Sequence, residues 1–130
     1  MHVTLLPDNW PRPKGYANGI VAEGTKHIFC GGQIGWNSEC IFETAEFVPQ
    51  LRQALLNVRA VLSCADAGPE HMTRMTWYIT DRQVYLDSLR EIGQVYRDVM
   101  GKNYPAMSVV EVSALIEAAA LVEVEVTAIA

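Results

Sequence analysis

The chain has 130 residues, of which half are apolar and 19% are charged, and its formal net charge is −5 at pH 7. This length suits a single domain over residues 1–130, and the apolar fraction excludes a disordered chain. No run reaches the roughly 18 apolar residues of a membrane span, and the N-terminus lacks a signal-peptide pattern. The ten basic residues are scattered, which argues against a nucleic-acid binder. We therefore expect a soluble cytoplasmic protein that contacts neither membranes nor nucleic acids.

Turn-forming residues divide the first part of the chain. Residues 7–15 are rich in proline and predict an extended arm. Tyr16–Ala22 and Lys26–Cys30 are rich in β-forming residues, and the Glu23-Gly24 pair between them predicts a hairpin. Three glycines between positions 31 and 35 then interrupt the regular pattern.

Helical and extended patterns alternate in the rest of the chain. The periodicity predicts a helix over 44–67, a strand over 72–80, a helix from Asp81 to about Met100, and strands over 106–115 and 121–129. Gly68-Pro69 ends the first helix, and Asp81 is a typical N-cap of the second. The order ββαβαββ predicts an α+β layer, with one sheet that carries both helices on one face.

The uncovered sheet face is expected to be partly apolar. It would carry Glu123 and Glu125 together with Met107, Val109 and one of the aromatic residues of strand 72–80. A face of this kind is usually buried against another subunit. We therefore expect an oligomer.

Two short segments could carry chemistry. The backbone of Gly31, Gly32 and Gln33 can approach a ligand closely and bind a carboxylate or oxyanion, although a tight turn is the simpler interpretation. Glu123 and Glu125 lie in an apolar strand, where a carboxyl group can act as a general acid or base or can simply be solvated. The three histidines and three cysteines lack metal-ligand spacing, so we expect neither a metal nor a cofactor.

Six segments, in order, resemble the reactive intermediate deaminase family, also called the YjgF/YER057c/UK114 family. They are residues 15–19 (GYANG), 29–34 (FCGGQI), 53–58 (QALLNV), 76–81 (TWYITD), 104–108 (YPAMS) and 122–125 (VEVE). The resemblance spans nearly the whole chain. It implies a chorismate-mutase-like α+β fold with one mixed sheet. It also implies a homotrimer in which the sheets form a central barrel and ligand clefts lie between neighbouring subunits.

The resemblance also assigns roles to residues. Characterised members hydrolyse reactive enamines or imines to ketones and ammonia without metal or cofactor. Glu123 matches the glutamate that positions or activates water, and Tyr16 matches a tyrosine that lines the cleft. Gly31, Gly32 and Gln33 match the turn that also lines it.

One departure from the family pattern bears on the substrate. Met107 stands where these members carry the arginine that anchors the substrate carboxylate. A thioether offers an apolar wall and cannot replace a bidentate guanidinium. The chain therefore resembles an arginine-lacking branch, for which we expect a more apolar or aromatic-derived small molecule. Trp36 or Trp77 could contribute walls to its site, and Arg12 or Lys14 on the arm could supply a cation from another direction.

These observations favour a cofactor-independent deaminase of an enamine or imine, with Glu123 as the catalytic residue. A version specific to one pathway, similar to 2-aminomuconate deaminase, fits the same residues. A trimeric ligand-binding or chaperone-like protein without catalysis is the alternative. A ribonuclease, proposed for some relatives, agrees poorly with the acidic composition.

Overall fold

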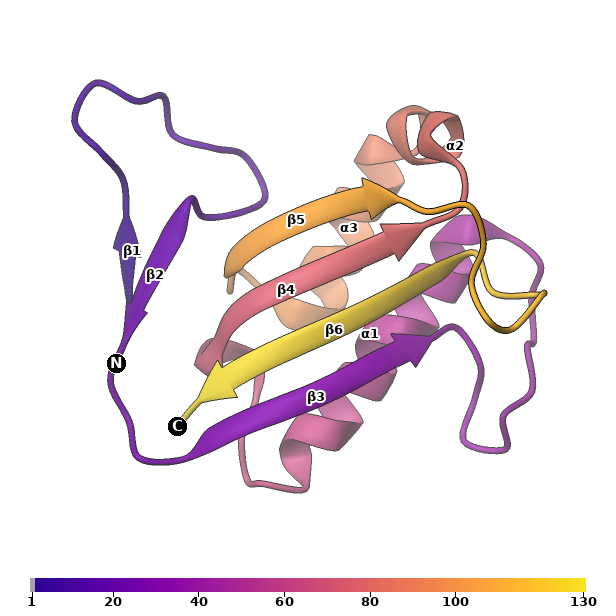
Figure 1. The fold of residues 1–130 in the computed structure, drawn as a ribbon, viewed down its shortest axis with the longest axis horizontal. Helices are drawn as coiled ribbons and strands as arrows, with labels where there is room; N and C mark the ends of the chain where they lie inside the picture. The colour runs from indigo at the N-terminus through magenta and orange to yellow at the C-terminus, as the bar shows by residue number, and fades with distance from the viewer. Residues whose placement is uncertain (1) are drawn as a thin grey trace.

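The computed structural model describes residues 2–130 (Figure 1). Its elements in chain order are β1 (His2–Leu5), β2 (Gly19–Ala22), β3 (His27–Ile34), α1 (Phe47–Ser63), a short 3-10 helix (Pro69–His71), β4 (Met72–Ile79), α2 (Arg82–Asp87), α3 (Leu89–Met100), β5 (Ala106–Glu111) and β6 (Val122–Ile129). None of the helices among these residues is long and apolar enough to cross a bilayer.

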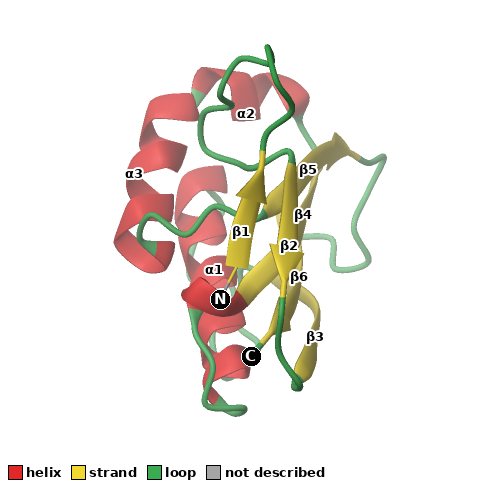
Figure 2. Cartoon of the chain, turned by 90° about the vertical axis from the view of Figure 1, so that its left-hand side faces the viewer, coloured by secondary structure: helices red, strands yellow, loops and turns green. Residues whose placement is uncertain are grey.

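Four strands form the main sheet, in the order β3-β6-β4-β5. β4 and β5 run parallel, whereas β6 is antiparallel to both β3 and β4, so the sheet is mixed. The helices cover one face and leave the other open (Figure 2). This arrangement confirms the α+β class and a mixed main sheet whose helices share a face, although β1 and β2 form a second sheet.

The predicted hairpin between Tyr16–Ala22 and Lys26–Cys30 is wrong. β2 instead pairs with β1, which the sequence pattern did not reveal, and β3 pairs with β6. The connection between β2 and β3 is bound to the end of β6, because the N–H groups of Thr25 and Lys26 both donate to the carbonyl of Ala130. β3 therefore enters the main sheet and leaves β1 and β2 as a separate two-stranded sheet.

The second predicted helix is divided at Ser88 into α2 and α3. Its start is as expected, since the Asp81 carboxylate accepts a hydrogen bond from the N–H of Val84 at 3.1 Å. Gly101 ends α3 with a positive φ of 68°, a conformation that favours glycine. The first helix is shorter than predicted, and Pro49 lies in its first turn, where no intrahelical N–H is required.

The core lies between the sheet and the helices. One face of β6 and one stripe of α1 supply most of its fully buried side chains, which include Leu51, Ala54, Leu55, Val58, Val122, Val124 and Ala128. Burying side chains of this size contributes roughly 1.5–3 kcal/mol for each large one. The apolar periodicities of both elements therefore mark core positions.

The expectation that Met107 and Val109 lie on the open sheet face is wrong, and of the two aromatic residues considered for that face, Trp77 lies on the other one. β5 pairs in register with β4, which places Met107 beside Met75 and Val109 beside Trp77. Both β4 residues are buried under the helices. All three side chains therefore face α3.

The open face instead carries Tyr78, Glu123 and Glu125, together with Phe29, which is 76% exposed. Tyr78 was the other aromatic residue expected there. An exposed phenyl ring on an uncovered sheet keeps the expectation of a partner subunit open.

Candidate functional site

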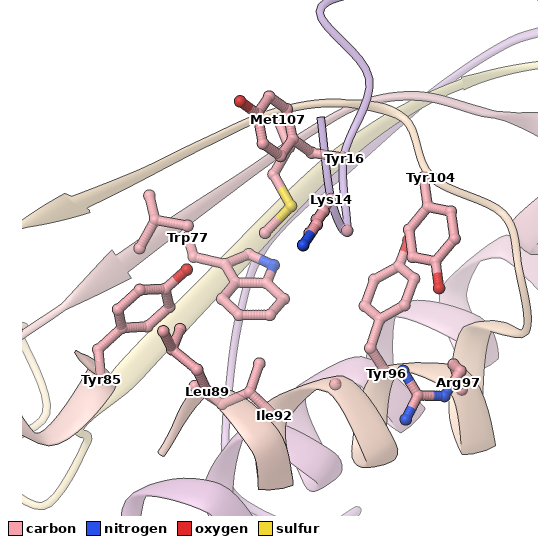
Figure 3. Close-up of a pocket in the computed structure, with 13 residues that line it drawn as sticks. Lys14, Tyr16, Trp77, Tyr85, Leu89, Ile92, Tyr96, Arg97, Tyr104 and Met107 are labelled. Carbon is pink, nitrogen blue, oxygen red and sulfur yellow. The ribbon is translucent and has the colours of Figure 1, made fainter. Parts of the chain in front are cut away.

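A cavity of about 480 Å³ lies between α3 and the β5 edge of the sheet (Figure 3). We call it the β5 cavity; its lining residues are Lys14, Gly15, Tyr16, Trp77, Tyr85, Leu89, Ile92, Gly93, Tyr96, Arg97, Tyr104, Met107 and Val109. The size is that of a pocket for a small organic ligand. Two residues predicted to bind substrate, Tyr16 and Met107, are brought together here.

Local backbone structure places Tyr16 at this cavity. Gly15 adopts a positive φ of 79°, which turns the arm back toward the sheet. The N–H of Ala17 then donates to the carbonyl of Pro105 at 3.0 Å, next to the start of β5. Tyr16 is held between these two points and remains 43% exposed at the mouth of the cavity.

The other predicted residues form a second cluster, which we call the β3 cluster: Gly31, Gly32, Gln33 and Glu123. The register of β3 against β6 shifts between Cys30 and Gln33, so Gly31 and Gly32 lie outside the regular pairing. Gln33 donates from its amide to the carbonyl of Gly31 at 3.2 Å. This bulge is the structure behind the predicted glycine turn.

Glu123 lies directly over this bulge. A Cβ atom added to Gly32 would fall 2.3 Å from Oε2 of Glu123, so the carboxylate occupies the space that a side chain would fill. The glycine thus permits a close approach between a carboxylate and a bare backbone segment. Within residues 2–130 the Glu123 carboxylate has no hydrogen bond or ion pair, and it is free to hold a water molecule.

Glu125, two residues along β6, is engaged differently. The hydroxyl of Tyr78 donates to the Glu125 carboxylate at 2.5 Å, and this hydrogen bond is the main cause of a raised pKa at Tyr78. Of the two carboxylates on the open face, Glu125 therefore has a partner and Glu123 does not. This difference favours Glu123 as the group available for chemistry.

Helix α1 supports the end of the β3 cluster. The side-chain amide of Asn57 donates to the carbonyls of Ile34 and Trp36, at 3.0 and 2.8 Å. Gly35 lies so close to the helix that an added Cβ would be 2.6 Å from the Cβ of Gln50. The segment that follows the bulge is therefore fixed against a packed helix.

The β5 cavity and the β3 cluster lie at opposite edges of the main sheet, since β3 and β5 are its two edge strands. They also lie on different faces, because Met107 points toward the helices and Glu123 points toward the open side. One chain thus does not unite the predicted site residues. It presents two partial sites.

Burial sets the protonation of several nearby groups. It raises the pKa of the Tyr85 and Tyr96 phenols, so both are neutral hydrogen-bonding groups at pH 7. Burial also raises the pKa of the Cys30 thiol, beside the glycine bulge, to about 11. No group of three histidine, cysteine, aspartate or glutamate side chains in residues 2–130 is arranged to hold a metal ion.

Comparison with known proteins agrees with this geometry. The endoribonuclease L-PSP family matches residues 11–130 of this chain. The chain belongs to this family. It is the YjgF/YER057c/UK114 family that the sequence motifs resemble.

Individual relatives cover most of the chain. It is 31% identical over 119 residues to the RutC family protein UK114 of Drosophila melanogaster, which covers 88% of this chain and 78% of the fly protein. The structure of the Rid family protein YyfB from Yersinia pestis superposes with a TM-score of 0.88, covering 99% and 98% of the two chains at 24% identity. The family member Rv2704 of Mycobacterium tuberculosis is 29% identical, with a TM-score of 0.65 over 90% and 88% of the two chains.

The β5 cavity also contains one tryptophan that the sequence offered as a wall and one arginine that it did not indicate. Trp77 forms part of its wall, and Arg97 reaches it from α3. The signal for Arg97 was its position four residues after Gly93, one helical turn along the same face. Lys14 lines the cavity as one of the two cations considered, whereas Arg12 lies outside it. Trp36 is remote and packs on Phe42 with a ring separation of 5.7 Å.

Proposed function

We propose that this protein is a cofactor-independent deaminase that hydrolyses a reactive enamine or imine to a ketone or keto acid and ammonia. Membership of a family that includes such enzymes supports the reaction class. The observation that carries the proposal is the unpartnered Glu123 carboxylate, which lies against the bare backbone at Gly32. A carboxylate in this position can orient and activate a water molecule.

The reaction needs only proton transfers and one water molecule. Protonation of the enamine carbon converts the C=C–N unit into an imine. Water held by Glu123 then adds to the imine carbon, and Glu123 receives its proton. Glu123 then gives this proton to the nitrogen of the tetrahedral carbinolamine. The C–N bond breaks, ammonia leaves, and the hydroxyl loses its proton to solvent as it becomes C=O. Backbone N–H groups of the glycine bulge are suited to hold a negatively charged substrate oxygen.

We further propose that the complete cleft forms between neighbouring copies in a homotrimer whose sheets build a central barrel. The two partial sites at opposite edges of one sheet support this arrangement, because the β5 edge of one copy would meet the β3 edge of the next. The open face with its exposed Phe29 supports it as well. Sedimentation equilibrium tests it directly; a stable monomer at assay concentration would contradict it.

The substrate is expected to differ from the standard small amino-acid-derived enamine. Met107 occupies the β5 cavity beside Tyr16, where an arginine would otherwise receive a carboxylate. A pathway-specific substrate of the aminomuconate type remains within the proposal. The same methionine is the observation that favours the alternative, a trimeric protein that binds a small ligand without turning it over.

The test is a Glu123→Gln variant assayed for ammonia release from 2-aminoacrylate generated in situ and from aminomuconate-type substrates. We expect a loss of roughly 10²–10⁴-fold in rate, the usual contribution of a general acid or base. Glu125→Gln is the matched control, on the same face and strand, and should retain most of the activity. Undiminished turnover in Glu123→Gln would contradict the assignment of Glu123. No ammonia release by the unmodified protein from any of these substrates would favour the alternative, a protein that binds a ligand without catalysis.

A further inference from the structure

The β5 cavity contains a buried hydrogen-bond donor without a partner. Trp77 is 2% exposed, and its indole Nε1 has no hydrogen-bond partner among residues 2–130. Buried tryptophan N–H groups are normally paired, and an unpaired one costs about 1–3 kcal/mol. Figure 3 shows this nitrogen turned into the cavity. Nε1 itself is covered by neighbouring side chains, so a ligand in this space reaches the donor when one of them moves aside.

The walls around this donor are aromatic and apolar. Tyr85 meets Trp77 edge-on with a ring separation of 6.5 Å, and Tyr96 lies at 6.5 Å on another side. Tyr96 in turn stacks on Tyr104 at 5.3 Å, with the rings 14° from parallel. The Tyr96 hydroxyl is already bound to the carbonyl of Asn103, so its ring presents mainly apolar surface. Such walls favour a planar ring in the ligand.

The mouth of the cavity is positively charged. Lys14 and Arg97 both line it, neither has a salt bridge among residues 2–130, and no aspartate or glutamate lines the cavity. The Arg97 guanidinium lies across Gly93, with Nη1 3.3 Å from the place of a Cβ atom at that residue. In a chain whose net charge is −5, this local excess of positive charge favours an anionic ligand.

We propose that the β5 cavity selects aromatic 2-imino acids, or their enamine tautomers, and releases aromatic 2-keto acids. Trp77 donates its N–H to the ligand carboxylate, and Lys14 and Arg97 supply the positive charge that Met107 cannot. The ring of the ligand packs among Tyr85, Tyr96 and Ile92. Trp77 is thus a specificity-determining residue. The proposal rests on the deaminase function for the reaction, and on the cavity alone for the ligand class.

The experiment measures binding of stable keto acids by isothermal titration calorimetry, independently of turnover. We expect phenylpyruvate to bind at least tenfold more tightly than pyruvate. A Trp77→Phe variant keeps an aromatic ring but removes the N–H, and should bind phenylpyruvate about 10- to 100-fold more weakly, because a hydrogen bond to a charged group contributes roughly that factor. Trp10→Phe, on the exposed arm and outside the cavity lining, is the matched control and should bind as the unmodified protein does.

A second variant does not depend on the buried tryptophan. Lys14→Gln with Arg97→Gln changes only exposed side chains. This double variant should bind phenylpyruvate about tenfold or more weakly than the unmodified protein does. Its affinity for the neutral analogue phenylacetamide should be unchanged, since only an anion is attracted by Lys14 and Arg97. Equal affinity of Trp77→Phe and the unmodified protein for phenylpyruvate would overturn the proposal, and would mean that water satisfies the indole. So would pyruvate binding as tightly as phenylpyruvate.

Failure of this proposal and failure of the deaminase proposal give different results. Binding of phenylpyruvate without ammonia release from any enamine contradicts the enzyme and keeps the cavity assignment. Ammonia release from 2-aminoacrylate, with no preference for the aromatic keto acid, contradicts the cavity assignment and keeps the enzyme.

Discussion

Replacing Gly32 with alanine should disable Glu123 without unfolding the protein. The added Cβ would lie 2.3 Å from Oε2 of Glu123, whereas ordinary contact begins at 3.4 Å. The carboxylate must therefore move by about 1 Å. Cδ and Cγ of the same side chain, at 2.6 and 2.9 Å, must turn with it, which a rotation about χ1 allows because none of the three is a backbone atom.

The magnitudes separate the effects on activity and on stability. A displacement of about 1 Å at a reacting group can cost about 10²-fold in rate, or about 2.7 kcal/mol in activation free energy. Alanine is favoured over glycine within a strand by roughly 0.5–1 kcal/mol. Moving Glu123 off its preferred rotamer costs roughly 0.5–1.5 kcal/mol. The free energy of unfolding should therefore change by less than about 1 kcal/mol.

Urea unfolding and ammonia release on the same preparations test this prediction. Glu125→Gln is the matched control, because Glu125 lies on the same strand and face but is already bound to Tyr78, and it should retain activity. The double variant Gly32→Ala with Glu123→Gln should be no slower than Glu123→Gln alone, since both changes remove one function. Full activity in Gly32→Ala, or additive losses in the double variant, would refute this explanation.

Two further predictions concern the supports of the β3 cluster. Asn57→Ala leaves two backbone carbonyls without their donor and should lower the free energy of unfolding by about 1–3 kcal/mol in urea titrations; an unchanged midpoint would show that water replaces the amide. Because the pKa of Cys30 is raised to about 11 from 9.0, its contribution to stability is present below pH 9 and is lost between about pH 9 and 11. Iodoacetamide at pH 8 should therefore modify the exposed Cys40 and Cys64 and spare Cys30, as mass spectrometry would show.

Much of the fold could be predicted from periodicity because its core elements are strongly patterned. The strand 122–129 alternates apolar and polar residues, and the structure buries the predicted set under the helices. The pairing of the strands was harder to predict from the sequence than the strands themselves. A Glu-Gly pair between two β segments indicates a hairpin locally, yet the partner of β3 is decided by β6, about a hundred residues away. The residues of a local turn do not show whether β3 pairs with β2 or with β6.

The candidate site shows a similar division. Motif resemblance found Glu123 and the glycine bulge because each is a short contiguous pattern. Met107 was assigned to the wrong face and the choice between Trp77 and Tyr78 stayed open, since these orientations depend on how β4 and β5 pair. Arg97 was missed because its relation to the cavity depends on a neighbour without a side chain, Gly93. A site residue whose role depends on neighbours far away in the sequence can be identified only from the structure.

Placing the two partial sites at opposite sheet edges has a kinetic consequence. In the proposed trimer, a complete cleft forms only when two copies associate. Activity therefore depends on the concentration of assembled protein, by mass action. Specific activity should then fall on dilution below the assembly dissociation constant instead of remaining constant. Each copy would also serve two clefts at once, giving its β3 edge to one and its β5 edge to another. One inactive copy would therefore inactivate both of the clefts to which it contributes, not one.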